Sequence, residues 1–274
     1  KAHPTLAQLR SQLQKTLYLE NIRIRNEAWE VDPEDEKDFW GKIKKKLIKA
    51  DPAQIDEDVS KEQHQELLQD IISRYVHEII GNFSPNIFWL TRQLLMRFFS
   101  RLFNSHFGGI RGFFNPKEEL INKLIVAGPV DKLRNLALKG TVILVPTHFS
   151  NLDSAIIGYG MDYIGMPAFQ YGAGLNLFNS KFFSFFMGNL GAYKLDRRKK
   201  NPIYLETLKS FSRTNILAGA HTIFFPGGTR SRAGNIETDL KLGLLGTVMD
   251  AQRTHFEKNP SNLAPKIFVV PLTL

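Results

Sequence analysis

Hydrophobic side chains recur at helical spacing through the first 80 residues of the chain. Thr5 stands where a helix N-cap is expected, directly before a stripe formed by Leu6, Leu9, Leu13 and Leu17. Asp32-Pro33 and Asp51-Pro52 predict the starts of two further helices, because aspartate is typical of the cap and proline of the first turn. An apolar stripe over residues 67–80, ended by Gly81, predicts one more. Such stripes are typical of helices that pack on one another, so this region is predicted to be helical.

A different pattern begins after Pro116, where short apolar runs alternate with helical segments. The expected strands cover residues 141–145, 166–171, 221–225 and 267–272, and the expected helices cover 151–160, 202–218 and 242–256. This alternation predicts an α/β fold with a mostly parallel sheet flanked by helices, preceded by an N-terminal helical extension. In such a fold the residues just past the strand ends line the ligand crevice.

Between these two patterns, Ser84-Pro85 opens a segment rich in aromatic residues and arginines, with no acidic residue from 85 to 114. Three interpretations are open. The aromatic side chains belong to the core, or they dock into a groove of a partner protein, or the segment lies in the headgroup plane of an anionic membrane with its arginines on phosphates. We therefore expect three regions: helices over residues 1–84, a basic amphipathic helix over 85–116 as a candidate membrane contact, and an α/β domain over 117–274.

Composition narrows the class of protein. The 274 residues, 43% hydrophobic and 23% charged, are typical of a folded globular chain. The absence of cysteine excludes disulfides, thiolate zinc sites and a cysteinyl acyl-enzyme. The net charge of +9 predicts an anionic partner. A membrane surface is favoured over nucleic acid, because the basic residues lie among aromatics and leucines and no nucleic-acid-binding motif is present.

His148 and Asp153 lie five residues apart, directly after the expected strand 141–145. In this arrangement the imidazole can take a proton from an alcohol, while the carboxylate orients the ring and stabilises the imidazolium. The spacing alone is a weak signal, because chance supplies it in about one chain in three of this kind. Ser150 and Ser154 are nearby alternatives as nucleophiles, but the chain has no Gly-x-Ser-x-Gly elbow. The pair is therefore predicted to be a general base with its orienting acid.

Two further segments suit an anionic ligand. Pro226-Gly227-Gly228 ends the expected strand 221–225 and is followed by Arg230 and Arg232. Glycines let backbone amides approach a ligand closely, and guanidinium groups bind phosphate in a forked geometry. The alternative is a tight turn with two solvated arginines.

The second segment runs from Phe178 to Lys200 and places many aromatic residues before a run of cations. It would offer an apolar groove beside a cationic site. Within it, Arg197 and Arg198 are predicted to contact phosphate, whereas Lys199 and Lys200 are predicted to form a solvated face.

Four segments in order resemble the glycerolipid acyltransferase family, which includes glycerol-3-phosphate and lysophosphatidate acyltransferases. They are His148 to Asp153, Gly191 to Arg198, Phe225 to Arg230, and Val269 to Leu272. The resemblance implies an O-acyltransferase of phospholipid synthesis, moving a fatty acyl group from acyl-CoA or acyl carrier protein to the hydroxyl of a glycerol-phosphate-type acceptor. The Arg-Ser-Arg-Ala-Gly tail and the Gly-Ala-Tyr segment resemble the glycerol-3-phosphate or dihydroxyacetone-phosphate branch of the family, and glycerol-3-phosphate is the favoured acceptor.

The resemblance also implies roles for individual residues. His148 and Asp153 would be catalytic, with no metal and no cofactor required. The substrate-binding residues would be Lys194, Arg197, Arg198, Gly227, Gly228, Thr229, Arg230, Ser231 and Arg232. The expected location is the cytoplasmic face of a membrane, with peripheral attachment or an anchor outside this chain.

The chain departs from the family pattern at one position. Gly227 stands where the family has an acidic residue that helps to build the acceptor site. Glu237 and Asp239, in the following loop, are candidate substitutes. A lysophosphatidate or lysophospholipid acyltransferase, and a non-catalytic lipid-binding relative, therefore stay open as alternatives.

Overall fold

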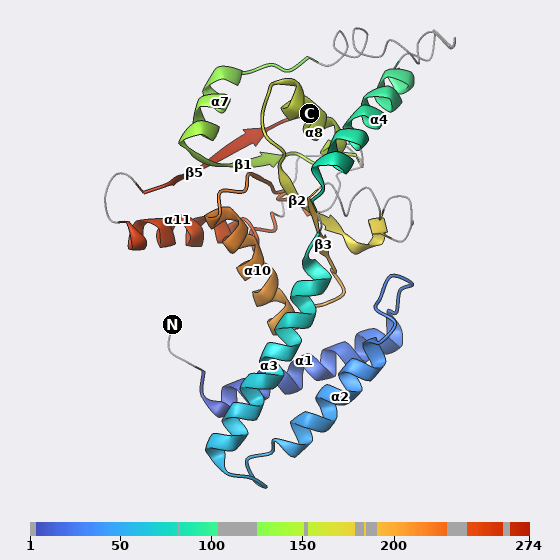
Figure 1. The fold of residues 1–274 in the computed structure, drawn as a ribbon, viewed down its shortest axis with the longest axis vertical. Helices are drawn as coiled ribbons and strands as arrows, with labels where there is room; N and C mark the ends of the chain where they lie inside the picture. Colours follow the sequence, from blue (N-terminus) through green and yellow to red (C-terminus); the bar gives the residue numbers. More distant parts are fainter. Residues whose placement is uncertain are drawn as a thin grey trace. The chain divides into compact units, whose positions relative to one another are not determined.

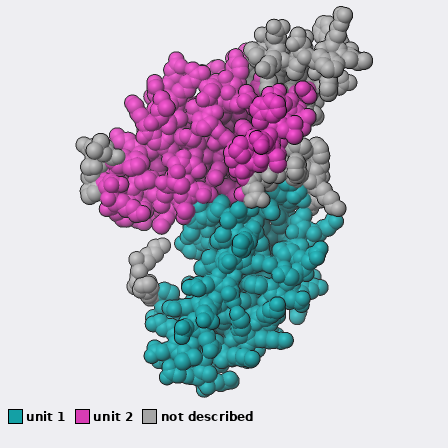
Figure 2. All heavy atoms as spheres, in the orientation of Figure 1, with its two compact units in different colours: residues 1–80, 173–184, 194–211 teal, residues 81–172, 185–193, 212–274 magenta. Residues whose placement is uncertain are grey.

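A computed structural model describes residues 4–81, 83–103, 125–150, 153–178, 184, 191–228, 240–259 and 264–274, without the side chains of 95, 96 and 98–103 (Figure 1). The chain forms two compact units (Figure 2). Unit 1 comprises residues 1–80, 173–184 and 194–211, and unit 2 comprises 81–172, 185–193 and 212–274. The units divide the chain differently from the three predicted regions, which stay a prediction.

Three helices make up the N-terminal part of unit 1: α1 (Leu6–Asn26), α2 (Glu36–Lys49) and α3 (Glu57–Ile79). The predicted cap of α1 is confirmed, because Thr5 and Gln8 form a reciprocal capping box. The apolar stripe of each helix is buried where the three helices pack together. The buried residues include Leu9, Leu13, Trp40, Ile43, Leu47, Leu67, Ile71 and Tyr75.

The predicted starts of α2 and α3 are wrong by several residues, because the expected capping aspartates are used elsewhere. Asp32 accepts a hydrogen bond from the N–H of Trp29 at 2.8 Å, and Asp51 accepts one from the N–H of Ala53 at 3.1 Å. Both carboxylates thus close turns before the helices begin. Helix α3 is capped instead by Asp56, whose carboxylate accepts hydrogen bonds from two N–H groups of the first turn.

The sheet contains strands β1 (Gly140–Pro146), β2 (Gln170–Gly174), β3 (Ala192–Leu195), β4 (Thr222–Ile223) and β5 (Lys266–Leu272), in the order β3-β2-β4-β1-β5. The pairings of β1 with β4, β1 with β5, and β2 with β4 are parallel. The predicted fold class is confirmed: a parallel sheet flanked by helices, with a helical N-terminal region. Strand β2 begins later than predicted, because the N–H groups of Gly165 and Met166 still close the turn that ends α8, and the N–H of Gln170 is the one that bonds to the carbonyl of His221 before β4.

Strand β1 is the centre of the unit 2 core, and its alternating side chains face two helical layers. Val142 and Leu144 pack with α7 (Val130–Lys139) and α8 (Asp153–Tyr163). Ile143 packs on the opposite face with residues of α10 (Pro202–Leu217) and α11 (Gly246–Lys258). All three are fully buried. This packing fixes the end of β1, where the predicted catalytic loop begins.

Helix α4 (Pro85–Phe103) starts at the predicted proline and contacts α8. Arg92 of α4 forms an ion pair with Asp162 of α8, with 2.6 Å between the charged atoms. Trp89, Leu90 and Leu94 are 59%, 46% and 41% exposed. Helix α4 thus contacts α8 through the Arg92–Asp162 ion pair, while several of its apolar side chains are exposed to solvent. Among the described residues, no helix is long and apolar enough to cross a membrane.

Candidate active site

His148 and Asp153 meet in the loop that connects β1 to α8. His148 is two residues past the end of β1, and Asp153 is the first residue of α8. The Nδ1 atom of His148 lies 3.0 Å from Oδ2 of Asp153. Because a carboxylate can only accept, Nδ1 carries the proton of the neutral ring and donates it, which leaves Nε2 unprotonated. The side chain of Asp153 is 5% exposed and that of His148 is 20% exposed, so the ring remains accessible.

The carboxylate of Asp153 is held by the backbone as well as by His148. The N–H groups of Phe149 and Ser150 each donate to Oδ2, at 2.7 Å. One oxygen therefore accepts three hydrogen bonds, and the carboxylate lies in the first turn of α8, where a negative charge is favourable. Sequence reasoning missed these two amides, because no residue type marks a backbone donor.

Phe225 packs against the ring of His148. The ring centroids of Phe225 and His148 are 4.3 Å apart, with an interplanar angle of 34°. Phe225 follows the end of β4, which pairs with β1 in the register Leu144 to Ile223. The ends of two neighbouring parallel strands therefore bring the first and third family segments together. Sequence reasoning had placed Phe225 in its segment without assigning it this contact.

The glycines after Phe225 form a tight turn. The N–H of Gly228 donates to the carbonyl of Phe225 at 3.1 Å, and the N–H of Lys241 donates to the carbonyl of Pro226 at 2.6 Å. Gly228 has a φ of +64°, and a Cβ there would lie 2.9 Å from Cδ of Lys241. Because the amide of Gly228 already closes the turn, it is less suited to bind substrate than predicted. Gly227 is buried, and its amide makes no hydrogen bond to another described residue.

Several predicted site residues lie outside the described part of the chain. They are Thr229, Arg230, Ser231 and Arg232 of the third segment, together with Glu237 and Asp239 of the loop that follows it. Their predicted roles stay predictions.

The cations that follow β3 differ in their surroundings. Arg197 is exposed and forms no ion pair with a described carboxylate. Arg198 is bound by Asp32 and Asp196, so its guanidinium is already occupied by protein carboxylates. Lys194, on β3, has its ammonium 5.5 Å from the ring centroid of Phe178. Of these cations, Lys194 and Arg197 have surroundings that suit an anionic ligand better than those of Arg198.

The predicted solvated face of Lys199 and Lys200 is half right. Lys200 is exposed, whereas Lys199 is buried and forms ion pairs with Glu36 and Glu78. The prediction for Lys199 is wrong because its counter-charges come from helices more than a hundred positions earlier in the sequence.

The fold and the loop geometry agree with the comparison to known families. The family model of the acyltransferases matches residues 129–274, which is more than half of the chain. The chain belongs to the acyltransferase family. The match contains the His148–Asp153 loop, the glycine turn and the final strand of the acyltransferase sheet.

Relatives named glycerol-3-phosphate acyltransferase match the chain at low identity. The relative from Pseudomonas paraeruginosa is 23% identical over 173 residues, which cover 63% of this chain and 18% of the relative. The one from Pseudoalteromonas atlantica is 25% identical over 183 residues, covering 66% and 20%. The one from Aeromonas hydrophila is 29% identical over 137 residues, covering 49% and 17%. The acyltransferase chain thus spans about a fifth of the length of these curated relatives.

Proposed function

We propose that this protein transfers a fatty acyl group from a thioester to the hydroxyl of a glycerol-phosphate-type acceptor, with glycerol-3-phosphate as the favoured acceptor. The observation that carries the proposal is the hydrogen bond between Nδ1 of His148 and the buried carboxylate of Asp153, which leaves Nε2 as the basic atom. The names of the relatives support glycerol-3-phosphate over other alcohols.

The reaction is a direct transfer in two steps. Nε2 of His148 removes the hydroxyl proton of the acceptor as that oxygen attacks the thioester carbonyl, and a tetrahedral oxyanion forms. The carbon–sulfur bond then breaks, the ester carbonyl forms, and the imidazolium returns its proton to the leaving thiolate of CoA or acyl carrier protein. Asp153 stabilises the imidazolium between the two steps. No metal or resident cofactor takes part.

The cations of the second and third family segments bind the acceptor phosphate in this proposal. They are Lys194, Arg197, Arg230 and Arg232. Gly227, in place of the family's acidic residue, removes a hydrogen-bond acceptor for the hydroxyl groups of the acceptor. That change keeps lysophosphatidate and other lysophospholipids as the second candidate acceptors, and a non-catalytic lipid-binding protein as the alternative to an enzyme.

The deciding experiment offers a palmitoyl or oleoyl thioester with glycerol-3-phosphate and lysophosphatidate in parallel, in the presence of liposomes. His148→Ala is expected to lower kcat by about a hundredfold to ten-thousandfold, because it removes the general base. His255→Ala, on α11, is the matched control and keeps full activity. An unchanged rate in His148→Ala contradicts the assignment of His148 as the general base. A folded wild-type protein that acylates neither acceptor favours the lipid-binding alternative.

A further inference from the structure

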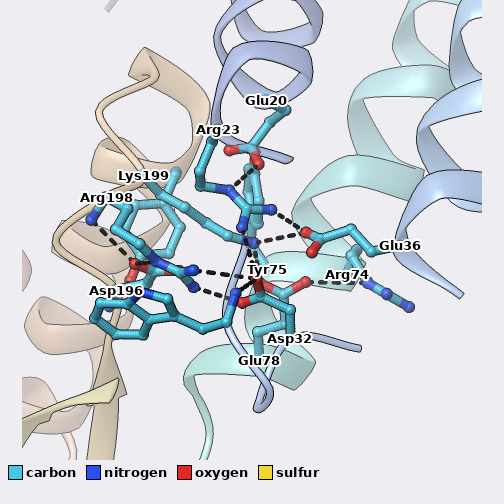
Figure 3. A network of polar contacts seen from close by, with 12 residues as sticks. Glu20, Arg23, Asp32, Glu36, Arg74, Tyr75, Glu78, Asp196, Arg198 and Lys199 are labelled. Carbon is cyan, nitrogen blue, oxygen red and sulfur yellow. Dashed lines mark hydrogen bonds and ion pairs between the residues drawn. The ribbon is translucent and has the colours of Figure 1, made fainter. Parts of the chain in front are cut away.

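A largely buried network of charged side chains joins the three N-terminal helices to residues 196–201, which follow β3 (Figure 3). Its cations are Arg23, Arg74, Arg198 and Lys199, and its carboxylates are Glu20, Asp32, Glu36, Glu78 and Asp196; we call these residues the ionic cluster. All of them belong to unit 1. Charges removed from water persist only where opposite charges and hydrogen bonds replace the lost hydration. The pairs that connect different elements therefore restrain those elements relative to one another.

Arg198 is held by two carboxylates and by an aromatic ring. Its Nη2 lies 2.5 Å from Oδ1 of Asp32 and 2.8 Å from Oδ2 of Asp196, and Nη1 donates to the second oxygen of Asp32 at 3.1 Å. The guanidinium also stacks on Trp29, with 3.9 Å from Cζ to the ring centroid. Forked ion pairs with a stacked face fix both the position and the plane of a guanidinium. The side chain is 7% exposed, so solvent competes little for these contacts.

Lys199 and Asn201 fasten the rest of the segment to α1, α2 and α3. The ammonium of Lys199 donates to Glu78 and lies 3.6 Å from Glu36. The side-chain amide of Asn201 donates to Glu20 at 2.6 Å and to the hydroxyl of Tyr75 at 2.8 Å. Arg198, Lys199 and Asn201 thus each bond to side chains of the N-terminal helical region. These contacts restrain the backbone between them.

Two cations near this segment, Lys194 on β3 and Arg197 within it, have no carboxylate partner in the part of the chain that the structure describes. Both belong to the second family segment. A cavity of about 260 Å³ adjoins Lys194 and is also lined by Asp32, Glu78 and Lys199. The wall contains three carboxylates, those of Asp32, Glu78 and Asp196. Each is already paired with a cation of the ionic cluster, which limits its repulsion of an anion. The cavity therefore gives a phosphate group room beside the ammonium of Lys194.

We propose that helices α1–α3 are a positioning element of the acceptor site, and that Asp32 and Glu78 are its positioning residues. By holding Arg198 and Lys199, they fix the backbone that presents Lys194 and Arg197 to the phosphate monoester of the acceptor. This inference rests on the proposed function, because it assigns the phosphate to those two cations. Asp32 and Glu78 act through the segment and do not themselves bind substrate.

The test compares three variants in steady-state assays with glycerol-3-phosphate and the acyl thioester varied in turn. Asp32→Asn removes one charge at nearly constant volume. The double variant E78Q/K199M removes a buried pair together, so that no charge is stranded: Arg74 keeps Asp35, and Glu36 keeps Arg23. Asp70→Asn is the matched control, because Asp70 forms an exposed ion pair with Lys46 on the same helices.

Asp32→Asn and the double variant are expected to raise KM for glycerol-3-phosphate by about tenfold or more, while KM for the thioester stays unchanged. Asp70→Asn keeps both values. In a Lys194→Gln/Arg197→Gln background, Asp32→Asn is expected to add little further loss of kcat/KM, because the groups that it positions are gone. Thermal unfolding confirms that each variant is folded.

Calorimetric titration with glycerol-3-phosphate separates this inference from the proposed function. One outcome supports the positioning role and contradicts the proposed reaction. In it, the wild type binds glycerol-3-phosphate, both cluster variants bind it more weakly, and none of the proteins transfers an acyl group. The positioning role is overturned if the folded cluster variants bind as tightly as the wild type, or if both KM values change alike. It is also overturned if the loss in Asp32→Asn adds fully to that of the Lys194→Gln/Arg197→Gln background, or if the wild type does not bind glycerol-3-phosphate.

Discussion

A single oxygen of Asp153 performs two tasks in the β1–α8 loop. Oδ2 accepts hydrogen bonds from the imidazole of His148 and from the N–H groups of Phe149 and Ser150. The two amides fix the carboxylate, and the carboxylate fixes the ring. In the proposed mechanism the loop therefore contributes both the imidazole of His148 and the two backbone amides that hold its orienting carboxylate.

Two substitutions of Asp153 are expected to separate these tasks. In Asp153→Asn the amide oxygen can accept the same three hydrogen bonds, so the fold is kept, but the charge that stabilises the imidazolium is lost. We expect kcat to fall by about a thousandfold, within the range of general-base effects, at a nearly unchanged Tm. Asp153→Ala removes the acceptor shared by the half-buried N–H groups of Phe149 and Ser150 and is expected to destabilise the fold by about 1–3 kcal/mol. Equal Tm values for the two variants would contradict the structural task of the carboxylate.

At the scale of elements, α4 combines a fixed side with an apolar exposed side. Its Arg92–Asp162 pair joins it to α8, the helix that begins with Asp153, while Trp89, Leu90 and Leu94 face solvent. We propose that these apolar side chains enter the headgroup region of an anionic membrane, at the cytoplasmic face. Burial of apolar area supplies the affinity, and the positive charge of the protein adds to it.

Vesicle binding tests this role of α4. Leu90→Gln/Leu94→Gln is expected to weaken binding to vesicles that contain anionic lipid by about tenfold or more, because two partly exposed leucines lose their transfer free energy. Leu138→Gln, on α7, is the control, since Leu138 is 87% exposed and lies on another helix. Co-sedimentation measures both. Undiminished binding by the α4 variant would assign membrane contact to another surface or remove it altogether.

His221, directly before β4, is expected to make the stability of the fold depend on pH. Nδ1 of His221 accepts a hydrogen bond from the N–H of Val142 at 2.9 Å, so this nitrogen must be unprotonated in the folded state. Burial lowers the pKa of His221 below its ordinary value of 6.5. The unfolded chain therefore takes up the proton more readily. The stabilising contribution is complete above pH 6.5 and is lost as the pH falls through 6.5 toward the folded pKa.

His221→Asn is expected to remove this pH dependence, because an asparagine oxygen can accept the same hydrogen bond without titrating. Urea unfolding from pH 8 to pH 5 should show that the wild type loses more stability than the variant as the pH falls. His255→Asn serves as a control for the loss of a histidine. Parallel curves for wild type and His221→Asn would show that His221 has no such role.

At the scale of the whole molecule, the sequence predicted the features that are set by residues close to one another in the chain. The strand, loop and helix around His148 are adjacent in the chain, so periodicity and the family pattern together located them. The capping aspartates were misplaced because Asp32 and Asp51 have competing partners. Lys199 was misread as solvated because a charge in a basic run is exposed by default. Its partner Glu78 is 121 positions away, and no local pattern indicates so distant a pair.

That separation has a consequence for biosynthesis. Four carboxylates of the cluster leave the ribosome early, those of Glu20, Asp32, Glu36 and Glu78. Of the cluster's cations, only Arg23 and Arg74 emerge with them, and Arg198 and Lys199 follow about 120 residues later. At about 5–20 residues per second the delay is on the order of ten seconds. During that time the nascent helices carry surplus negative charge where their interior will be. They can be buried completely only when Arg198 and Lys199 arrive, so helices α1–α3 finish folding only after a segment about 120 residues further along the chain has been made.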